Sequence, residues 1–202
     1  MTLSNNTHKS KIIDSEFLIS AYASGYFPMA DSRAGEIGWY SPDPRAIIPV
    51  DKLKISRSLR QALRKNIFDL RIDTSFEPVM RSCAEREDTW ISETIIESYI
   101  KLFQLGYAHS IESWKNEKLV GGLYGVSIGA AFFGESMFSR VRDASKVALV
   151  HLVDKLRAAK FELLDTQFIT PHLKSLGAIE MSRSDYLILL KNAVNKQRTF
   201  GK

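Results

Sequence analysis

A chain of 202 residues, 45% of them hydrophobic, can bury one sizeable core, or a main domain with a small one beside it. The 25% share of charged residues excludes wholesale disorder, and a single cysteine excludes an intramolecular disulfide. The net charge of +5 suggests an anionic partner without requiring a nucleic acid. Neither a signal peptide nor an apolar run of about 18 residues that could span a membrane is present, so we expect a cytoplasmic protein.

The N-terminal part of the chain predicts a short helix followed by a rigid turn. Residues 1–12 are polar and expected to be flexible. A helix is predicted over residues 15–24 and ends at Gly25. Residues 39–45 contain two prolines spaced by one residue, which exclude a helix. This aromatic segment is either a packed loop or one wall of a binding site.

Residues 56–66 predict a helix with one apolar and one basic side. The basic side carries Arg57, Arg60, Arg64 and Lys65. A solvated face is the commoner explanation for such a group of charges. The alternative is a surface that contacts phosphates, because few acidic residues balance these cations.

The rest of the chain alternates between helical and extended patterns. A short helix is expected within residues 73–86, and an amphipathic helix runs from residue 92 to Gly106. The further predicted elements are a strand over 107–114, one long glycine-containing strand over 119–133, a helix over 145–160, a strand over 161–165, a helix over 171–176, a strand over 179–181 and a helix over 185–195. This order predicts a mixed sheet flanked by helices, in the α+β or α/β class.

The order of elements is compatible with the N-acetyltransferase (GNAT) type of fold. Enzymes of that type that use acyl-CoA need a pyrophosphate-binding loop, and the sequence contains none. A P-loop, a Gly-x-Ser-x-Gly elbow and Cys/His metal spacing are also absent from the sequence. We therefore expect chemistry without ATP, a metal or another cofactor.

Polar groups beside apolar segments are the most informative feature of the chain. Residues 134–140 and the triplet Asp165-Thr166-Gln167 place carboxylates, hydroxyls and an arginine at the ends of segments that otherwise resemble buried strands. Burying an unpaired carboxylate is costly, and acids in such surroundings cluster at functional sites. These two stretches therefore predict an active site.

The chain resembles the bacterial leucyl/phenylalanyl-tRNA–protein transferases, roughly over residues 16–190. The stretches that carry the resemblance are residues 25–28, 39–45, 89–91, 108–112, 119–126, 134–140, 144–146, 165–167 and 175–178. Tyr40 stands where the family often has a second tryptophan, and an aromatic face there can still stack on a base. Thr166 stands where the family often has cysteine, so a cysteine nucleophile is not required at that position.

The resemblance implies a small N-terminal domain, residues 13–66, and an acetyltransferase-like catalytic domain, residues 67–202. It implies transfer of Leu, Phe or Met from aminoacyl-tRNA to the α-amino group of proteins with N-terminal Arg or Lys, which marks them for degradation in the N-degron pathway. The alternative is another N-acyltransferase that depends on aminoacyl-tRNA or acyl-CoA. The partners would be aminoacyl-tRNA and acceptor proteins, and a monomer is expected.

Three residues are expected to carry the chemistry. Asp165, through Gln167, would orient the incoming amine and help take up its proton. The alternatives are that Asp165 is only a cap or turn residue, or that the ribose 2′-hydroxyl of the tRNA moves the proton. Glu135 would hold the cationic acceptor or the α-amino group of the donor. Its alternative is a salt bridge with Arg140 that braces the loop.

The resemblance also assigns residues to the two ends of the donor. The pocket for the donor side chain would contain Leu123, Phe132 and Met137, although single apolar positions more often belong to the core. The terminal adenosine would meet Trp39, Tyr40, Trp90 and Tyr99, and the basic helix would bind the acceptor stem. His109 and His172 are expected to be structural, and Cys83 is expected to be inert.

Overall fold

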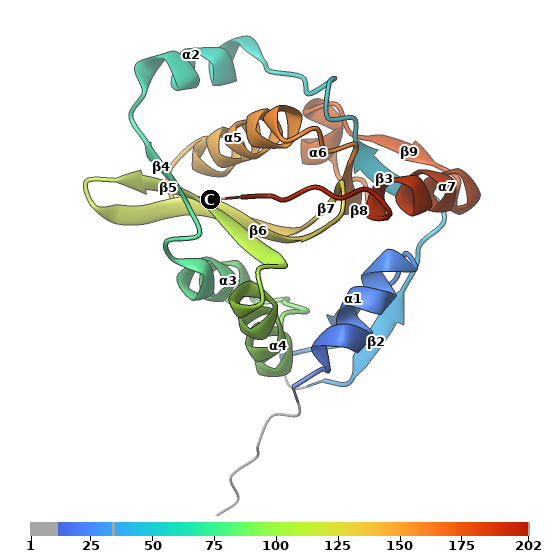
Figure 1. The fold of residues 1–202 in the computed structure, drawn as a ribbon. Helices are drawn as coiled ribbons and strands as arrows, with labels where there is room; N and C mark the ends of the chain where they lie inside the picture. The colour runs from blue at the N-terminus through green and yellow to red at the C-terminus, as the bar shows by residue number, and fades with distance from the viewer. Residues whose placement is uncertain (1–11, 34, 202) are drawn as a thin grey trace, which may run out of the picture.

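The computed structural model describes residues 12–33 and 35–201, and Figure 1 shows their arrangement. The predicted flexible segment, residues 1–12, lies outside the described residues except for Ile12. A two-stranded sheet accompanies a seven-stranded sheet with helices on both faces. The architecture is therefore mixed α+β with a small N-terminal region, as the sequence predicts.

The N-terminal region consists of α1 (Ser15–Ala23) and a hairpin of β1 (Phe27–Ala30) and β2 (Ile37–Tyr40). Asp14 caps α1 by accepting a hydrogen bond from the backbone N–H of Phe17. The predicted rigid turn is in fact the second strand of this hairpin and the loop after it. Strands of four residues are too short to show the alternation that identifies a strand in a sequence.

The large sheet has the order β4-β5-β6-β7-β8-β3-β9, in which β7 and β8 are parallel and the other neighbours antiparallel. Its strands are β4 (Asp69–Ile72), β5 (Ala108–Lys115), β6 (Lys118–Ile128), β7 (Ala131–Ser139), β8 (Leu163–Gln167), β3 (Arg45–Ile48) and β9 (Ile179–Met181). β3 lies within the predicted N-terminal domain, residues 13–66, but pairs with β8 and β9. The backbone of that range therefore contributes to both sheets.

The predicted long strand over residues 119–133 is wrong, because the chain turns at Gly129 and Ala130 between β6 and β7. Gly129 has a φ of 58°, and a Cβ there would lie 2.5 Å from the carbonyl oxygen of Val194. Glycine is required at this turn for both reasons. As a result, Glu135 lies within β7 and not beyond the end of a strand.

Helices cover both faces of the large sheet (Figure 1). One face carries α2 (Arg57–Lys65), α5 (Ala144–Ala158) and α6 (Pro171–Ser175), and the other carries α3 (Phe76–Ala84), α4 (Glu93–Gln104) and α7 (Arg183–Val194). Serines accept a backbone hydrogen bond at the start of α2, α4 and α7, and α7 begins at Arg183, two residues before the helix start that the sequence predicts. Among the helices of the described residues, none has the length and apolar character needed to cross a membrane.

Candidate active site

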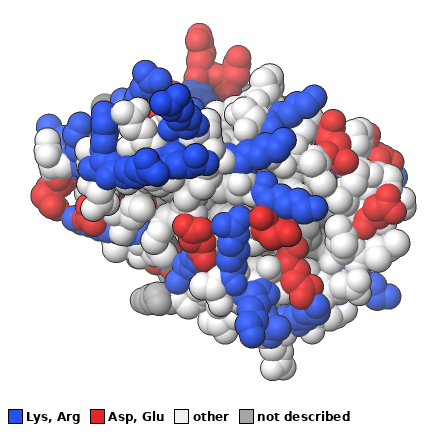
Figure 2. Space-filling model, turned by 90° about the horizontal axis from the view of Figure 1, so that it is seen from above, with Lys and Arg blue, Asp and Glu red and all other residues white. Residues whose placement is uncertain are grey.

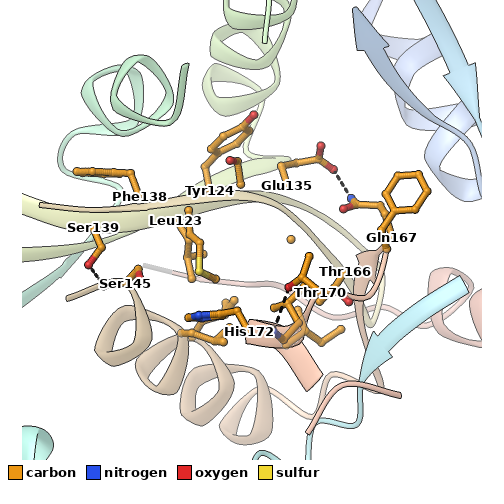
Figure 3. A pocket seen from close by; sticks show the side chains of 18 of the residues that line it. Leu123, Tyr124, Glu135, Phe138, Ser139, Ser145, Thr166, Gln167, Thr170 and His172 are labelled. Atoms are coloured by element: carbon orange, nitrogen blue, oxygen red, sulfur yellow. Dashed lines mark hydrogen bonds between the residues drawn. The ribbon is translucent and has the colours of Figure 1, made fainter. Parts of the chain in front are cut away.

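A cavity opens where two parallel strands separate. β7 and β8 pair only where residues 131–133 face residues 163–165, although both strands continue further. Beyond this point a cavity of about 540 Å³ lies between them, with α5 and α6 along one side (Figure 3). The two stretches that the sequence identifies, residues 134–140 and 165–167, both contribute to its walls. The interrupted pairing therefore creates the space for a ligand.

The deep part of the cavity is apolar. The predicted pocket residues Leu123 and Met137 line it, together with leucines from α5 and β8 that the sequence interpretation missed: Leu149, Leu152 and Leu164. Phe132 does not line the cavity. It is fully buried in the core, and its ring centroid lies 5.2 Å from that of Phe200.

Glu135 is buried in the wall of this cavity with one oxygen unmatched (Figure 3). Its Oε1 accepts hydrogen bonds from the Tyr22 hydroxyl at 2.7 Å and from Gln167 Nε2 at 3.0 Å. Its Oε2 is buried and has no hydrogen-bond partner among the described residues. The Tyr22 hydroxyl in turn contacts the hydroxyl of Tyr99. An unmatched buried acceptor needs an explanation, and a cationic or hydrogen-bonding ligand supplies one.

Burial raises the pKa of the Glu135 carboxyl to about 8, and the hydrogen bonds from Tyr22 and Gln167 oppose this shift only in part. An α-amino group has a pKa of about 7.7–8.0. Proton exchange between Glu135 and an α-ammonium group in the cavity would therefore be nearly balanced. The alternative salt bridge between Glu135 and Arg140 is not formed, because Arg140 pairs with Glu85 at 2.8 Å.

Asp165 is fully buried and does not line the cavity. Arg45 binds both of its oxygens, with distances of 3.0 Å from Nε and 2.5 Å from Nη2, and the Tyr186 hydroxyl donates at 2.8 Å. Asp165 Oδ1 also accepts the backbone N–H of Gln167 at 2.9 Å, which is the contact that a turn residue makes. Asp165 therefore lies within β8 and is one partner of a buried ion pair.

The aromatic residues predicted for the adenosine site separate into two groups. Tyr40 and Trp90 line a second cavity of about 670 Å³, which adjoins the first through Met29 and Trp90. Trp39 packs edge-on against Phe17, with ring centroids 5.0 Å apart. Tyr99 is fully buried beneath Glu135. The structure therefore brings Tyr40 and Trp90 together at a ligand-sized space, and leaves Trp39 and Tyr99 in packing roles.

The basic residues of α2 are exposed and lie on one face of the molecule. Figure 2 shows Lys and Arg side chains gathered over this helix, and Arg57, Arg60, Arg64 and Lys65 all belong to its exposed surface. Leu59 points the other way and is buried. α2 packs on α5, which forms one wall of the cavity, so the basic surface lies on the side of the sheet from which α5 contributes to the cavity.

The histidines and the cysteine differ in their relation to the cavity. His109 Nδ1 lies 2.8 Å from Asp73, its ring stacks on Phe200, and it does not line the cavity. His172 does line it, and burial and the nearby Lys146 lower its pKa. Burial raises the pKa of the Cys83 thiol to about 12, as expected of an inert cysteine. Within the described chain, no three His, Cys, Asp or Glu side chains gather as a metal site requires.

Three residues around the buried carboxylates escaped the sequence interpretation: Tyr22, Arg45 and Tyr186. A signal was present for Arg45, since this charged residue directly precedes the apolar residues 46–48. That is the same pattern that identifies Glu135 and Asp165. The two tyrosines gave no such signal, because tyrosine is common on the apolar side of a helix.

Two models of protein families match most of the chain. Residues 47–191 match a model described as leucyl/phenylalanyl-tRNA protein transferase, and residues 12–43 match the model of the N-terminal domain of the same protein. The junction between the two models, residues 44–46, falls at the start of β3. The domain that contains β1 and β2 is thus matched separately from the large sheet.

Curated relatives with the name leucyl/phenylalanyl-tRNA–protein transferase match over nearly their whole length. The protein from Gloeobacter violaceus is 52% identical over 89% of this chain and 93% of its own length. Those from Paramagnetospirillum magneticum and Herpetosiphon aurantiacus are 52% and 51% identical, and cover 94% and 95% of this chain and 93% and 100% of their own. Among solved structures, that of L-PGS from Bacillus licheniformis has a TM-score of 0.43 and 12% identity over 81% of this chain and 56% of that one.

Proposed function

The chain belongs to the leucyl/phenylalanyl-tRNA protein transferase family, and we propose that it moves leucine, phenylalanine or methionine from aminoacyl-tRNA to the α-amino group of an acceptor protein. The donor is an ester and is already activated, so its aminolysis needs no ATP. The amine nitrogen attacks the ester carbonyl, the bond to the ribose oxygen breaks, and the proton lost by the amine ends on that oxygen.

One observation carries the proposal: the apolar cavity between β7 and β8 ends at Glu135, whose Oε2 has no partner in the described chain. An apolar space suits the donor side chain, and a carboxyl group with one unpaired oxygen suits an amine. Both substrates would thereby meet at one point, and such positioning supplies a large share of the rate in a two-substrate reaction.

Glu135 and Gln167 would handle the acceptor amine. The ionised form of the Glu135 carboxyl can accept a proton from the α-ammonium group, because the carboxyl pKa of about 8 lies close to that of the amine. The Gln167 amide, 3.0 Å from Glu135 Oε1, would orient the same nitrogen. Asp165 would act through Gln167, whose backbone N–H it binds.

Proton transfer by the ribose 2′-hydroxyl of the tRNA is the alternative to transfer by the protein. A donor that lacks the 2′-hydroxyl distinguishes the two routes. If Glu135 takes the proton, leucine is still transferred from this donor by the wild type, and transfer is lost in Glu135→Gln. If Asp165→Ala leaves turnover near normal, Asp165 has no part in catalysis.

The remaining predicted residues would contact the three parts of the donor: its side chain, its terminal adenosine and the acceptor stem. Leu123 and Met137, with the leucines of α5 and β8, would hold the donor side chain, and Phe132 would support the pocket from the core. Tyr40 and Trp90 would stack on the terminal adenosine, whereas Trp39 and Tyr99 would only support the surrounding packing. Arg57, Arg60, Arg64 and Lys65 would bind phosphates of the acceptor stem.

The acceptor would begin with Arg or Lys, and the transfer would mark it for degradation. Two positive charges, on the α-amino group and the side chain, suit a cavity that offers a carboxylate. We also propose an acetyltransferase-like catalytic domain, supported by a mixed sheet whose parallel strands β7 and β8 separate at the site.

The test is transfer of radiolabelled leucine from Leu-tRNA to a model protein that begins with Arg, beside the same protein beginning with Ala. Label on the Arg protein alone establishes the reaction and its acceptor rule. Label on neither, with folded enzyme and intact Leu-tRNA, rejects the proposal. A Leu-peptide formed in the absence of tRNA from a leucyl thioester would instead favour another N-acyltransferase.

A further inference from the structure

We propose that Arg45 and Tyr186 are positioning residues for the transfer, which hold Asp165 and, through it, the backbone and side chain of Gln167 in the geometry that faces the acceptor amine. The inference rests on the proposed function. It assigns a role to two residues that do not themselves line the cavity.

The contacts of Arg45 occupy the whole guanidinium group. Nε and Nη2 bind the two oxygens of Asp165, and Nη1 donates to the carbonyl oxygen of Gly25 at 3.1 Å. The guanidinium carbon lies 4.8 Å from the centre of the Phe27 ring and 4.5 Å from that of Tyr186. Arg45 is 1% exposed and Asp165 is 0% exposed. A lysine cannot reproduce this two-pronged, stacked arrangement.

Asp165 transmits this fixed position to Gln167. It accepts the Gln167 backbone N–H, and Gln167 has a φ of 59°, in the left-handed region that residues other than glycine seldom adopt. Such a backbone persists only where its surroundings hold it, and it is found often at functional sites. The Gln167 amide contacts Glu135, while the Asp165 carboxylate binds Arg45. The amide position therefore depends on a carboxylate that does not reach the cavity.

The network also joins segments far apart in the sequence. Gly25 and Phe27 come from the N-terminal region, and Arg45 is the first residue of β3. Asp165 lies in β8, and Tyr186 lies on α7. If Arg45 and Tyr186 served the fold alone, their loss would lower stability without a specific effect on turnover. If they hold Gln167, their loss acts on the chemical step through that residue.

The experiment measures kcat and KM for donor and acceptor with Arg45→Lys and Tyr186→Phe, using Leu-tRNA and a peptide that begins with Arg. We expect kcat to fall about 10–100-fold in Arg45→Lys and less in Tyr186→Phe, with KM for Leu-tRNA nearly unchanged, because a small displacement of a reacting group has effects of this size. Tyr186→Phe removes only one hydroxyl, so it tests the proposal even if Arg45→Lys folds poorly.

Two controls separate positioning from stability. Arg71→Lys changes an arginine that pairs with Asp69 and Glu117 at the other edge of the sheet, and Leu156→Ala destabilises α5 away from the cavity. Both are expected to keep the kcat of the folded wild-type protein. A loss of kcat in Leu156→Ala that matches the loss in Tyr186→Phe would overturn the proposal.

A double-mutant cycle with Gln167→Ala tests the route of the effect. If Tyr186 and Arg45 act through Gln167, adding either variant to Gln167→Ala lowers kcat little further. Multiplied effects, or unchanged kcat in the single variants, would overturn the inference while wild-type transfer stands. Absence of transfer in the wild type would reject the proposed function instead.

Discussion

Glu112 on β5 and Glu135 on β7 are both buried carboxylates of the same sheet, and both lie in stretches that carry the family resemblance. Glu112 accepts hydrogen bonds from the backbone N–H groups of Thr74 and Ser75, from the hydroxyls of Thr74 and Ser110, and from the indole of Trp114. Glu135 accepts two, both on one oxygen, and its other oxygen has no hydrogen-bond partner among the described residues. Burial is common to both residues, and the number of donors separates them.

The difference indicates two uses of a buried charge. Five donors satisfy the Glu112 carboxylate, and through it β5 is joined to the start of α3. Glu135 keeps one oxygen without a donor among the described residues, and its side chain contributes to the wall of the cavity. A buried carboxylate is thus a sign of function when its acceptor capacity exceeds the donors around it.

The largest effect is expected from Glu135→Gln. Loss of the proton-accepting carboxyl should lower the transfer rate by about 10²–10³-fold, the usual contribution of a general base. The measurement is single-turnover transfer from Leu-tRNA to an Arg-peptide with saturating substrates. Glu112→Gln is the matched control, since it makes the same change in a buried glutamate away from the cavity. Similar rate losses in the two variants would erase the distinction between them.

Glu112→Gln should act on stability. The amide NH₂ group would face the donors that now bind a carboxylate oxygen, so we expect a loss of about 2–3 kcal/mol in the free energy of unfolding. Urea unfolding at pH 7 measures this loss, and transfer per folded molecule should stay at the wild-type rate. Unchanged stability would mean that the five donors are not what keeps Glu112 buried.

The sequence alone could not make this distinction. Glu112 and Glu135 both stand between apolar neighbours in strand-like patterns, so the local sequence presents them alike. Their donors come from positions such as Thr74 and Tyr22, which are 38 and 113 residues away. Asp165 and Arg45, 120 residues apart, are a third example. The sequence therefore locates the polar groups, and the fold decides which of them are satisfied.

Elements with a strong local pattern were predicted well. The amphipathic helices α4 and α5 and the strand β5 lie close to their predicted ranges, because a periodic pattern over eight or more residues identifies them. The short strands β1, β2, β3 and β4 were missed, since four residues carry too little pattern. The cavity walls from α5 and β8 were missed for the same reason: core leucines and pocket leucines are alike in a sequence.

A pH dependence sharpens the comparison further. Folded Glu135 keeps its proton up to about pH 8, whereas the unfolded carboxyl loses it near its ordinary pKa of 4.5. Between these values the folded state binds more protons, so the stability of the wild type falls as the pH rises from 4.5 to 8, and then levels off. Glu135→Gln lacks this dependence, and relative to the wild type its free energy of unfolding should rise by about 3–4 kcal/mol between pH 5 and pH 8.

Urea unfolding of both proteins at pH 5 and pH 8 measures this change, and the other titrating groups cancel in the difference between them. A constant difference across the range would mean that the Glu135 carboxyl is already ionised in the fold at pH 5. Glu135 would then be satisfied in the way that Glu112 is, and the contrast between the two sites would be lost.

The exposed cations of α2 differ from both buried carboxylates, because the fold does not need these charges. Arg57, Arg60 and Arg64 are exposed and cost little to neutralise, because surface charges contribute under about 1 kcal/mol each to stability. Replacing all three by Gln should weaken Leu-tRNA binding about tenfold and make its salt dependence shallower by about two units of the log–log slope. The measurement is a binding titration of Leu-tRNA at several salt concentrations.

A small leucyl-adenosine donor separates binding of the stem from chemistry, since it has no stem to bind. The rate of transfer from leucyl-adenosine should be unchanged in the triple variant if α2 only binds phosphates. The matched control is Arg71→Gln, Arg81→Gln and Lys101→Gln, which removes the same charge from β4, α3 and α4, away from α2. An equal loss of tRNA affinity in this control would mean that overall charge, and not the α2 surface, attracts the tRNA. An equal loss with the small donor would place the arginines in support of the cavity itself.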